Sequence, residues 1–320
     1  MALLSNDEYK KLVRAGVIGH AVGDAVGFPM ETLTREEARL CPATDMEGLG
    51  AHFAPAGSWS EDTSMTIATM QSVIDCDVFD YRDIMKKFCS WWLNNRFTPA
   101  DSIIAINEAC SEALNNFYYH NLDPVQCGDK REEGNNNNAI MRILPVAYAC
   151  HRKGFTGFER YDLVRSVASL TNAHEVNIMG CHIYVDFICH LLDGVKPFDA
   201  YALIQKGDYS RYDDKTVRSY RRILEGDIAN LLEKEIESDN NVVHALEASL
   251  WSLLNTDCYR SATLCAANLG CDADTVGAIT GSMAGIAYGY DAIPQTWLNK
   301  LKKRDYLLDI CDNFADAICK

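Results

Sequence analysis

The chain has 320 residues, of which 48% are hydrophobic, so it can bury a large core and is not expected to be disordered. Acidic residues outnumber basic residues by 45 to 30, which gives a formal net charge of -15. This charge opposes non-specific binding to nucleic acid or to an anionic membrane surface. A negatively charged substrate would therefore need local compensation, for example from a bound cation.

The cysteines and the start of the chain indicate the compartment. The thirteen cysteines include no CxxC pair and no zinc-ligand spacing, and the first residues lack the basic-then-apolar order of a signal peptide. No window approaches 18 uninterrupted apolar residues. We therefore expect a reducing, cytoplasmic compartment and no membrane span. The sequence does not indicate an oligomeric state.

Helical periodicity dominates the chain. Ser5 and Glu8 form a capping-box pattern ahead of a helix predicted over residues 9–27, and Thr98 with Pro99 is predicted to open a helix that continues to residue 117. Further helices are predicted over residues 161–170, 177–192, 216–238, 240–254, 258–270 and 275–289.

Convincing alternating strands, internal repeats and linkers are absent from the sequence. The polar stretch over residues 127–138 is predicted to be a loop. The sequence therefore predicts an all-α fold, with residues 1–320 forming a single compact multi-helix domain.

Two predicted helices carry glycine at every fourth position. These glycines are Gly19, Gly23 and Gly27 in the first helix, and Gly277, Gly281, Gly285 and Gly289 in the second. Glycine inside a helix costs about 1 kcal/mol relative to alanine, so such a face is useful mainly where two backbones approach closely. We expect these helices to be central and tightly packed.

Two acidic stretches resemble one another. "GSWSEDTSMT" (57–66) and "NLGCDADTVGAIT" (268–280) each place two acids and a hydroxyl at a predicted helix N-terminus. Helix capping alone would explain either stretch, because free amides and the helix dipole favour negative charge there. A metal site is the alternative if the two helix starts converge.

A convergent site would contain four carboxylates. Like charges about 4 Å apart repel by roughly 4 kcal/mol at an effective dielectric constant of 20, so such a cluster needs cations or protons. Carboxylate and hydroxyl oxygens suit Mg²⁺, Ca²⁺ or Mn²⁺ better than Zn²⁺. Two ions bridged by a shared carboxylate would fit this set of ligands.

A third acidic segment is "GDAVGFPMET" (23–32), in which Pro29 ends the first glycine-rich helix and leaves Glu31 on a loop. Glu31 or Asp24 could reach a shared site. Glu31 could equally be a solvated loop acid, and Asp24 a capping or buried hydrogen-bonded acid.

Five blocks of the sequence together resemble the ADP-ribosylglycohydrolases, especially the bacterial type, in order and in spacing. They are "GDAVGFPME", "WSEDTSMT", "NNNNAIMRILP", "LTNAHE" and "NLGCDADTVGAITGSMAGIAYG". The resemblance extends from about residue 12 to the end. It implies an all-α fold with a centre of two Mg²⁺ ions, or Mn²⁺, that hydrolyses the bond at the anomeric carbon of the terminal ribose in ADP-ribose or an ADP-ribosylated substrate.

The resemblance also implies roles for individual residues. The metal ligands would be Ser60, Glu61 and Asp62 for one ion, Asp272 and Thr275 for the other, and Asp274 as the bridge between them. We expect Glu31 to be the catalytic acid/base, with Asp62 the second candidate. The glutamate would accept or donate a proton as the bond breaks through an oxocarbenium-like state.

The Asn-rich segment matches the phosphate loop of the family, whose backbone amides would cradle the diphosphate. The substrate-binding residues implied are Asn135, Asn136, Asn137, Asn138, Ala139, Met141 and His174. The family usually alternates Asn and Gly here. A polar surface loop without a ligand is the alternative for this segment, and a cap or packing residue is the alternative for His174. Arg142 could be a structural arginine that ties a helix to a loop.

The first acidic stretch also differs from the common family form Thr-Asp-Asp-Thr, because Ser60 and Glu61 replace its first two residues. Glutamate extends the carboxylate by about 1.5 Å, and octahedral Mg²⁺ tolerates such shifts poorly. Two alternatives to the hydrolase therefore stay open: an ADP-ribose-binding protein with weak or no turnover, and a nucleotide-like phosphohydrolase. The sequence does not specify the linkage. We expect Phe53, Phe117, Tyr118 and Tyr119 to pack in the core rather than stack on adenine.

Overall fold

The computed structural model describes residues 4–104, 106–131 and 134–320. The α-helices are α1 (Asn6–Gly27), α2 (Arg35–Leu40), α3 (Glu61–Cys76), α4 (Tyr81–Asn94), α5 (Glu108–Tyr118), α6 (Leu144–Lys153), α7 (Gly157–Ala168), α8 (Glu175–Leu192), α9 (Pro197–Ile204), α10 (Asp214–Ser219), α11 (Arg221–Leu224), α12 (Val242–Leu254), α13 (Tyr259–Ala267), α14 (Ala273–Tyr288), α15 (Gln295–Lys300) and α16 (Arg304–Ile318). Short 3₁₀ helices are η1 (Phe28–Met30), η2 (Gly50–His52), η3 (Pro124–Gln126), η4 (Ile140–Arg142), η5 (Ile228–Asn230), η6 (Glu233–Glu235) and η7 (Tyr290–Ala292). Only isolated β-bridges accompany them in these ranges, which confirms the predicted all-α fold.

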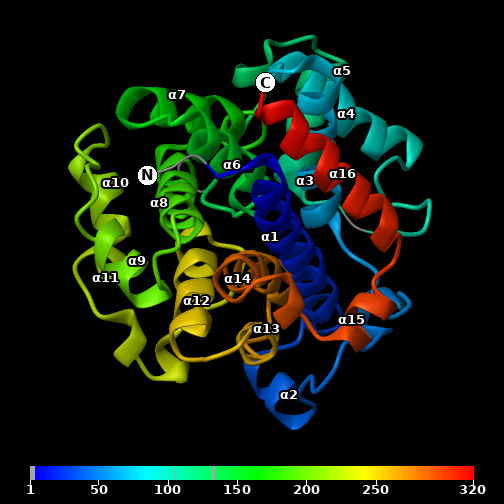
Figure 1. The fold of residues 1–320 in the computed structure, drawn as a ribbon, viewed down its shortest axis with the longest axis vertical. Helices are drawn as coiled ribbons and strands as arrows, with labels where there is room; N and C mark the ends of the chain where they lie inside the picture. Colours follow the sequence, from blue (N-terminus) through cyan, green and yellow to red (C-terminus); the bar gives the residue numbers. More distant parts are fainter. Residues whose placement is uncertain (1–3, 105, 132–133) are drawn as a thin grey trace.

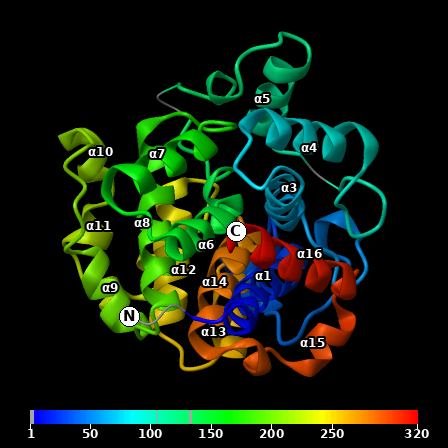
Figure 2. The same cartoon turned by 45° about the horizontal axis from the view of Figure 1, so that its top comes forward.

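Helices α1 and α14 lie side by side at the centre of the molecule (Figures 1 and 2). A Cβ added at Gly23 would lie 2.0 Å from the carbonyl oxygen of Gly277, and one at Gly285 would lie 2.1 Å from that of Ala15. Glycine is therefore required where these two backbones touch. Gly289 differs from the prediction, because it ends α14 at φ +87° with open space around it.

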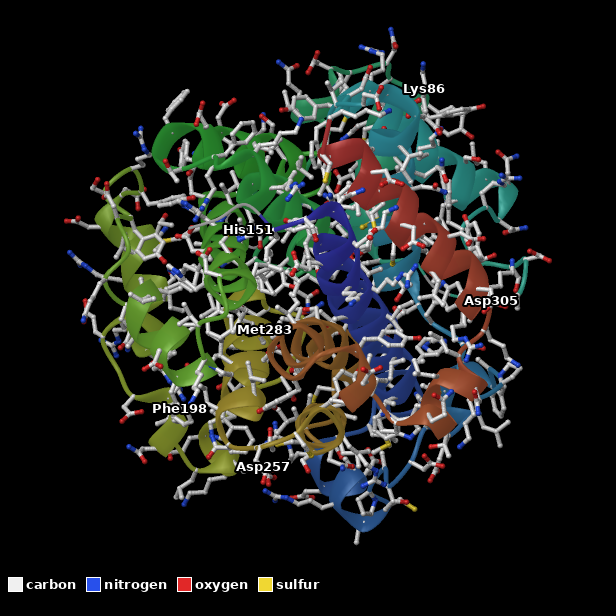
Figure 3. All side chains as sticks on the ribbon, viewed as in Figure 1. Lys86, His151, Phe198, Asp257, Met283 and Asp305 are labelled. Atoms are coloured by element: carbon white, nitrogen blue, oxygen red, sulfur yellow. The ribbon has the colours of Figure 1, made fainter. Side chains whose placement is uncertain are left out.

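The remaining helices surround this pair (Figures 1 and 2). Helix α3 packs against α4 and α16, while α8 packs against α6, α7 and α12. Met283 of α14 is fully buried near the centre of Figure 3, whereas Phe198 lies at the periphery and is 58% exposed. In the described part of the chain, no helix is both long and apolar enough to cross a membrane.

The sequence correctly predicted how α1 begins but misplaced the start of α5. The capping box of Ser5 and Glu8 is present at α1. The predicted start at Thr98 is wrong, because the Thr98 hydroxyl donates to the Asn95 carbonyl at 2.8 Å and α5 begins only after Asn107. The Asn107 side chain caps α5 by accepting from the Ala109 amide at 2.9 Å.

The single helix predicted over residues 216–238 is also wrong, since α10, α11, η5 and η6 replace it. Tyr220 interrupts the helix because its buried hydroxyl donates to the Val176 carbonyl at 2.7 Å. Two predictions fall partly outside the described residues: Ala105 in the helix over 98–117, and Glu132 and Glu133 in the loop over 127–138.

Candidate metal centre

The first turn of α3 is held by a carboxylate that α1 supplies. Both oxygens of Asp24 accept from the Ser60 amide, at 2.9 and 3.1 Å, and one of them also accepts from the Thr63 amide at 3.1 Å and the Thr63 hydroxyl at 2.6 Å. The Ser60 hydroxyl caps the helix by accepting from the Asp62 amide at 3.2 Å. Asp24 is therefore a buried hydrogen-bonded acid, one of the two alternatives for it.

These bonds leave the acids of the same turn free. Asp62 is 1% exposed, and its Oδ2 has no hydrogen-bond partner among the described residues. Glu61 beside it is half-buried. A buried carboxylate oxygen without a partner is costly, so this oxygen requires a proton or a cation.

The turn before α14 is held by bonds from outside its own helix. The Thr32 amide donates to the Cys271 carbonyl at 2.8 Å, and the Cys271 amide donates to the Leu33 carbonyl at 2.6 Å. The Asp272 amide in turn donates to the Ser238 carbonyl at 2.9 Å. The first pair of bonds ties the Glu31 loop to this turn.

The two acidic turns and the Glu31 loop meet in one place. Carboxylate oxygens of Glu31, Asp272 and Asp274 lie within 4.8 Å of one another. Asp62 is near enough that its charge raises the pKa of Asp274. The close contact of α1 with α14, together with Asp24 under the start of α3, produces this convergence.

Burial dominates the electrostatics of this group. It raises the pKa of Glu61 to about 7 and that of Asp272 to about 6. Burial also raises the pKa of Asp24 to about 7, although hydrogen bonds from Thr63 and Ser60 lower it. The pKa values of Asp62 and Asp274 lie well above the ordinary range because of burial and, secondarily, neighbouring carboxylates.

This set of donors fits hard divalent cations. Its oxygens come from carboxylates and hydroxyls, and one buried carboxylate oxygen lacks a partner among the described residues. The raised pKa values of Asp62 and Asp274 mean that their ionised forms need a compensating charge. The residues predicted to hold metal, Ser60, Glu61, Asp62, Asp272, Asp274 and Thr275, lie on the two turns that converge. Their assignment as ligands stays a prediction.

The Asn-rich segment contacts the same group of carboxylates. Asn137 donates from its side chain to Asp272, and its backbone amide donates to the Asn240 carbonyl at 2.9 Å. In this structure the Asn137 amide is engaged by this bond, and a contact of Asn137 with a diphosphate stays a prediction. Asn138, Ala139 and Met141 are buried.

A polar cavity of about 420 Å³ opens beside the Asn-rich segment. Its lining comprises Asn107, Glu108, Ala109, Asp129, Arg131, Gly134, Asn135, Asn136, Asn240 and Asn241. Asn135 and Asn136 thus line a cavity, and their contact with substrate stays a prediction. His174 caps α8 through its ring Nδ1, which lies 3.4 Å from the Val176 amide. The capping alternative for His174 is present, and a ligand contact stays a prediction.

Two predictions about other side chains have different outcomes. Arg142 is fully buried and donates to the Val167 carbonyl at 3.2 Å and the Thr171 hydroxyl at 2.6 Å, which is a structural role. The predicted core packing of the aromatic residues holds for Phe117, which is 8% exposed. It is wrong for Phe53, Tyr118 and Tyr119, which are exposed because their loop and helix end project from the core.

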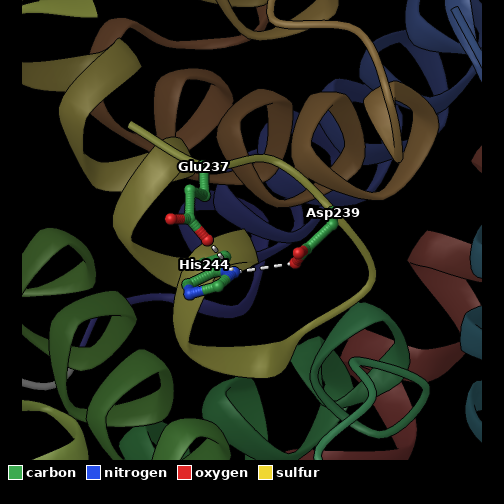
Figure 4. Close-up of side chains that lie close together, drawn as sticks. All are labelled: Glu237, Asp239 and His244. Carbon is green, nitrogen blue, oxygen red and sulfur yellow. Dashed lines mark hydrogen bonds and ion pairs between the residues drawn. The ribbon is translucent and has the colours of Figure 1, made fainter. Parts of the chain in front are cut away.

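A second group of possible ligands lies on the segment that precedes α12. The His244 Nδ1 is 2.8 Å from Asp239 and 3.1 Å from Glu237, as Figure 4 shows. All three side chains are at least partly exposed, and their contacts with one another account for the arrangement. The group lies on the same segment as Ser238 and Asn240, whose carbonyls accept from the amides of Asp272 and Asn137.

Sequence reasoning missed several contributors to the site. They include His52, which contacts Glu31, and Arg131, Asn240 and Asn241, which line the cavity. Only the two asparagines carried a signal, because "DNN" ahead of a helical run is a capping pattern.

Comparison with known proteins identifies the family of the chain. The sequence model of the ADP-ribosylglycohydrolase family matches residues 5–320. An ADP-ribosylarginine hydrolase of Serratia proteamaculans is 27% identical over 97% of this chain and 80% of its own length. An ADP-ribosyl glycohydrolase of dinitrogen reductase from Rhodospirillum rubrum is 28% identical over 89% of this chain and 88% of its own length.

A solved structure gives the same result for the fold. A chain from an ADP-ribosylglycohydrolase-related protein complex superimposes with a TM-score of 0.82 at 25% identity, over 98% of this chain and 100% of that chain. The match covers both acidic turns and the Asn-rich segment. The protein described here belongs to the ADP-ribosylglycohydrolase family.

Proposed function

We propose that this protein is a Mg²⁺-dependent hydrolase that removes ADP-ribose from the guanidino group of arginine in modified proteins. Family membership and the names of the relatives support ADP-ribosyl glycohydrolase activity. The metal dependence and the arginine linkage go beyond what the family and the relatives show, and they are our proposal.

The convergence of Glu31, Asp272 and Asp274 with Asp62 is the observation that carries the proposal. Bringing these carboxylates together is costly while they are ionised, and the structural hydrogen bonds of Asp272 and Asp274 do not neutralise their charge. Two bound Mg²⁺ ions, or Mn²⁺, would offset this charge and supply sites that orient ribose hydroxyls and a water molecule.

Residues of the chain account for the other requirements of the reaction. The bond from the anomeric carbon to nitrogen breaks, a bond from that carbon to a water oxygen forms, and one proton of the water ends on the released guanidine. Glu31 would carry this proton, since it is the acid of the group that lies on a loop and is 22% exposed at its side chain. Asp62 is the second candidate.

The cavity beside the Asn-rich segment would hold the remainder of ADP-ribose. Asn135 and Asn136 offer amide groups there, and Arg131 offers guanidinium N–H donors while its charge pairs with Asp129 at 2.9 Å and Glu112 at 3.0 Å. A single arginine with several amides can bind a diphosphate without a strongly basic surface. This is compatible with a net charge of -15.

The arginine linkage is proposed from relatives. Proteins of Serratia proteamaculans and Pseudomonas putida that are named ADP-ribosylarginine hydrolases match 97% and 95% of this chain, at 27% and 26% identity. A guanidinium leaving group also suits an acidic surface, because the positively charged group is attracted to it.

The test uses two peptides that carry ADP-ribose on arginine or on serine. Each is incubated with the protein and either Mg²⁺ or a chelator, and free ADP-ribose is quantified by mass spectrometry. We expect release from the arginine peptide with Mg²⁺ only. Glu31→Gln should abolish release, whereas Glu36→Gln, which changes an exposed acid on α2, should not.

Other outcomes would support the alternatives. Binding of ADP-ribose without release from either peptide would indicate a binding protein. Cleavage within the diphosphate would indicate a phosphohydrolase. Release from the serine peptide alone would contradict the arginine linkage but not the hydrolase.

A further inference from the structure

The side chain of Glu31 has one specific partner outside the carboxylate cluster. Its Oε2 lies 2.6 Å from Nε2 of His52, and the two side chains are 22% and 19% exposed. This geometry is a hydrogen bond in which the imidazole N–H donates to the carboxylate.

His52 is itself held in place by packing. Its ring stacks on Phe28 with centroids 4.7 Å apart and planes 8° apart, and Phe28 is 3% exposed. Gly50 of the same short helix presses on Pro29, because a Cβ at Gly50 would lie 2.5 Å from the Pro29 Cα. The imidazole is therefore fixed to the segment that carries Glu31.

This contact opposes a repulsion that would displace Glu31. Oxygens of Asp272 and Asp274 lie within 4.8 Å of Glu31 oxygens, and like charges at about 4 Å repel by roughly 4 kcal/mol at an effective dielectric constant of 20. Glutamate has three rotatable side-chain bonds and could turn toward solvent. The bond to His52 retains the carboxylate at the rim of the cluster.

We propose that His52 is a positioning residue for Glu31: it engages Oε2 and thereby directs the other carboxylate oxygen toward the water that attacks ADP-ribose. This inference rests on the proposed function, in which Glu31 carries the proton. Partners that orient a functional side chain typically contribute 10- to 100-fold to activity or affinity. The expected contribution is to kcat, because the binding of ADP-ribose does not require this orientation.

Two substitutions separate the hydrogen bond from the stacking. His52→Phe keeps a ring on Phe28 but removes the donor, and His52→Gln restores an N–H donor near the position of Nε2. His120→Phe is the matched control, because His120 is an exposed histidine elsewhere on the surface. Rates are measured with the ADP-ribosylated arginine peptide, and the Kd of ADP-ribose and the melting temperature are measured alongside.

We expect His52→Phe to lower kcat about 10-fold or more, with the KM of the peptide, the Kd of ADP-ribose and the melting temperature unchanged. His52→Gln should recover most of the rate, and His120→Phe should behave as the wild type.

The inference is overturned if His52→Phe changes kcat by less than twofold, or if His52→Gln is as slow as His52→Phe. When Glu31→Gln is inactive in the same assay, such a result overturns the role of His52 and leaves the proposed function intact. Full activity of Glu31→Gln, or no turnover by the wild type on any linkage, overturns both.

Discussion

The turns that begin α3 and α14 look alike in sequence but are held in different ways. At α3, Asp24 from a neighbouring helix accepts from the Ser60 and Thr63 amides, and Asp62 keeps an oxygen without a partner. At α14, the helix has no side-chain cap from Asp272, and Asp274 accepts from the Thr275 amide at 2.9 Å.

This difference shows how a protein can place acids at a helix N-terminus without using them as caps. At α3 the buried Asp24 accepts hydrogen bonds from the first turn of the helix. Glu61 and Asp62 are therefore not needed as caps and are available to bind a cation. At α14 the acids also have a structural role, because Asp272 accepts a hydrogen bond from the Asn137 side chain of the Asn-rich loop. Replacing an acid at α3 should therefore affect function more selectively than replacing one at α14.

The largest effect is expected from Asp62→Asn. Removal of this charge should lower kcat by about 10³-fold, which corresponds to about 4 kcal/mol of transition-state stabilisation. The metal-free variant should be at least as stable as the wild type, because a buried charge without a partner is removed. Initial rates and chemical denaturation check both parts. Strong destabilisation together with retained activity would mean that Asp62 is a structural acid.

A second substitution separates the convergence of the turns from general stability. A Cβ at Gly27 would lie 2.0 Å from the Ala273 carbonyl, beside the α14 turn, and one at Gly19 would lie 2.4 Å from the Gly281 carbonyl, farther along the helix. Both alanine variants should lose about 1–3 kcal/mol of stability through overpacking.

Only Gly27→Ala should also weaken Mn²⁺ binding, because it displaces Asp274 from the α3 turn. Thermal denaturation and Mn²⁺ titration of the two variants test this prediction. Equal loss of Mn²⁺ affinity in Gly19→Ala would show that the glycines near the turns have no special part in the site.

The pH dependence of the metal-free protein is the third prediction. Folding raises the pKa of Asp24 and Glu61 to about 7 and that of Asp272 to about 6, from about 4 in the unfolded chain. The folded state therefore binds these protons more tightly, and its stability falls as pH rises from about 4 to about 7.

Melting temperatures at pH 5 and pH 8 measure this effect. The chelated protein should melt at a lower temperature at pH 8, and Mg²⁺ should reduce the difference because cations favour the ionised carboxylates. A chelated protein that is equally stable at both pH values would show that the cluster is not the buried charge described here.

The smallest expected effect concerns Ser60. Ser60→Ala should cost about 1 kcal/mol as a lost helix cap, and Asp80→Ala, which removes the cap of α4, should cost a similar amount. If Ser60 also contacts a cation, only Ser60→Ala should weaken Mg²⁺ binding in isothermal titration. Equal Mg²⁺ affinity in the two variants would restrict Ser60 to capping.

The features that the sequence predicted are those fixed by local or periodic patterns. The capping box of Ser5 and Glu8 depends on neighbouring residues, and the glycine repeats of α1 and α14 depend on helical geometry. Both are present in the structure. The similarity of the two acidic turns likewise identified the segments that meet.

The features that it missed depend on contacts between distant segments. Tyr220 interrupts a periodic helical run because a distant carbonyl accepts from its hydroxyl, which no local pattern encodes. His52 reaches Glu31 through stacking on Phe28 across an irregular loop. The Asn137 amide likewise donates to the carbonyl of Asn240, which lies far away in the sequence.

Titration with Mn²⁺, followed by electron paramagnetic resonance, tests most directly whether the two turns and the Glu31 loop form one cation site. The account predicts two Mn²⁺ ions for each wild-type chain, with loss of binding in both Asp62→Asn and Asp274→Asn. Absence of bound Mn²⁺ in the wild type, or unchanged binding in both variants, would contradict it.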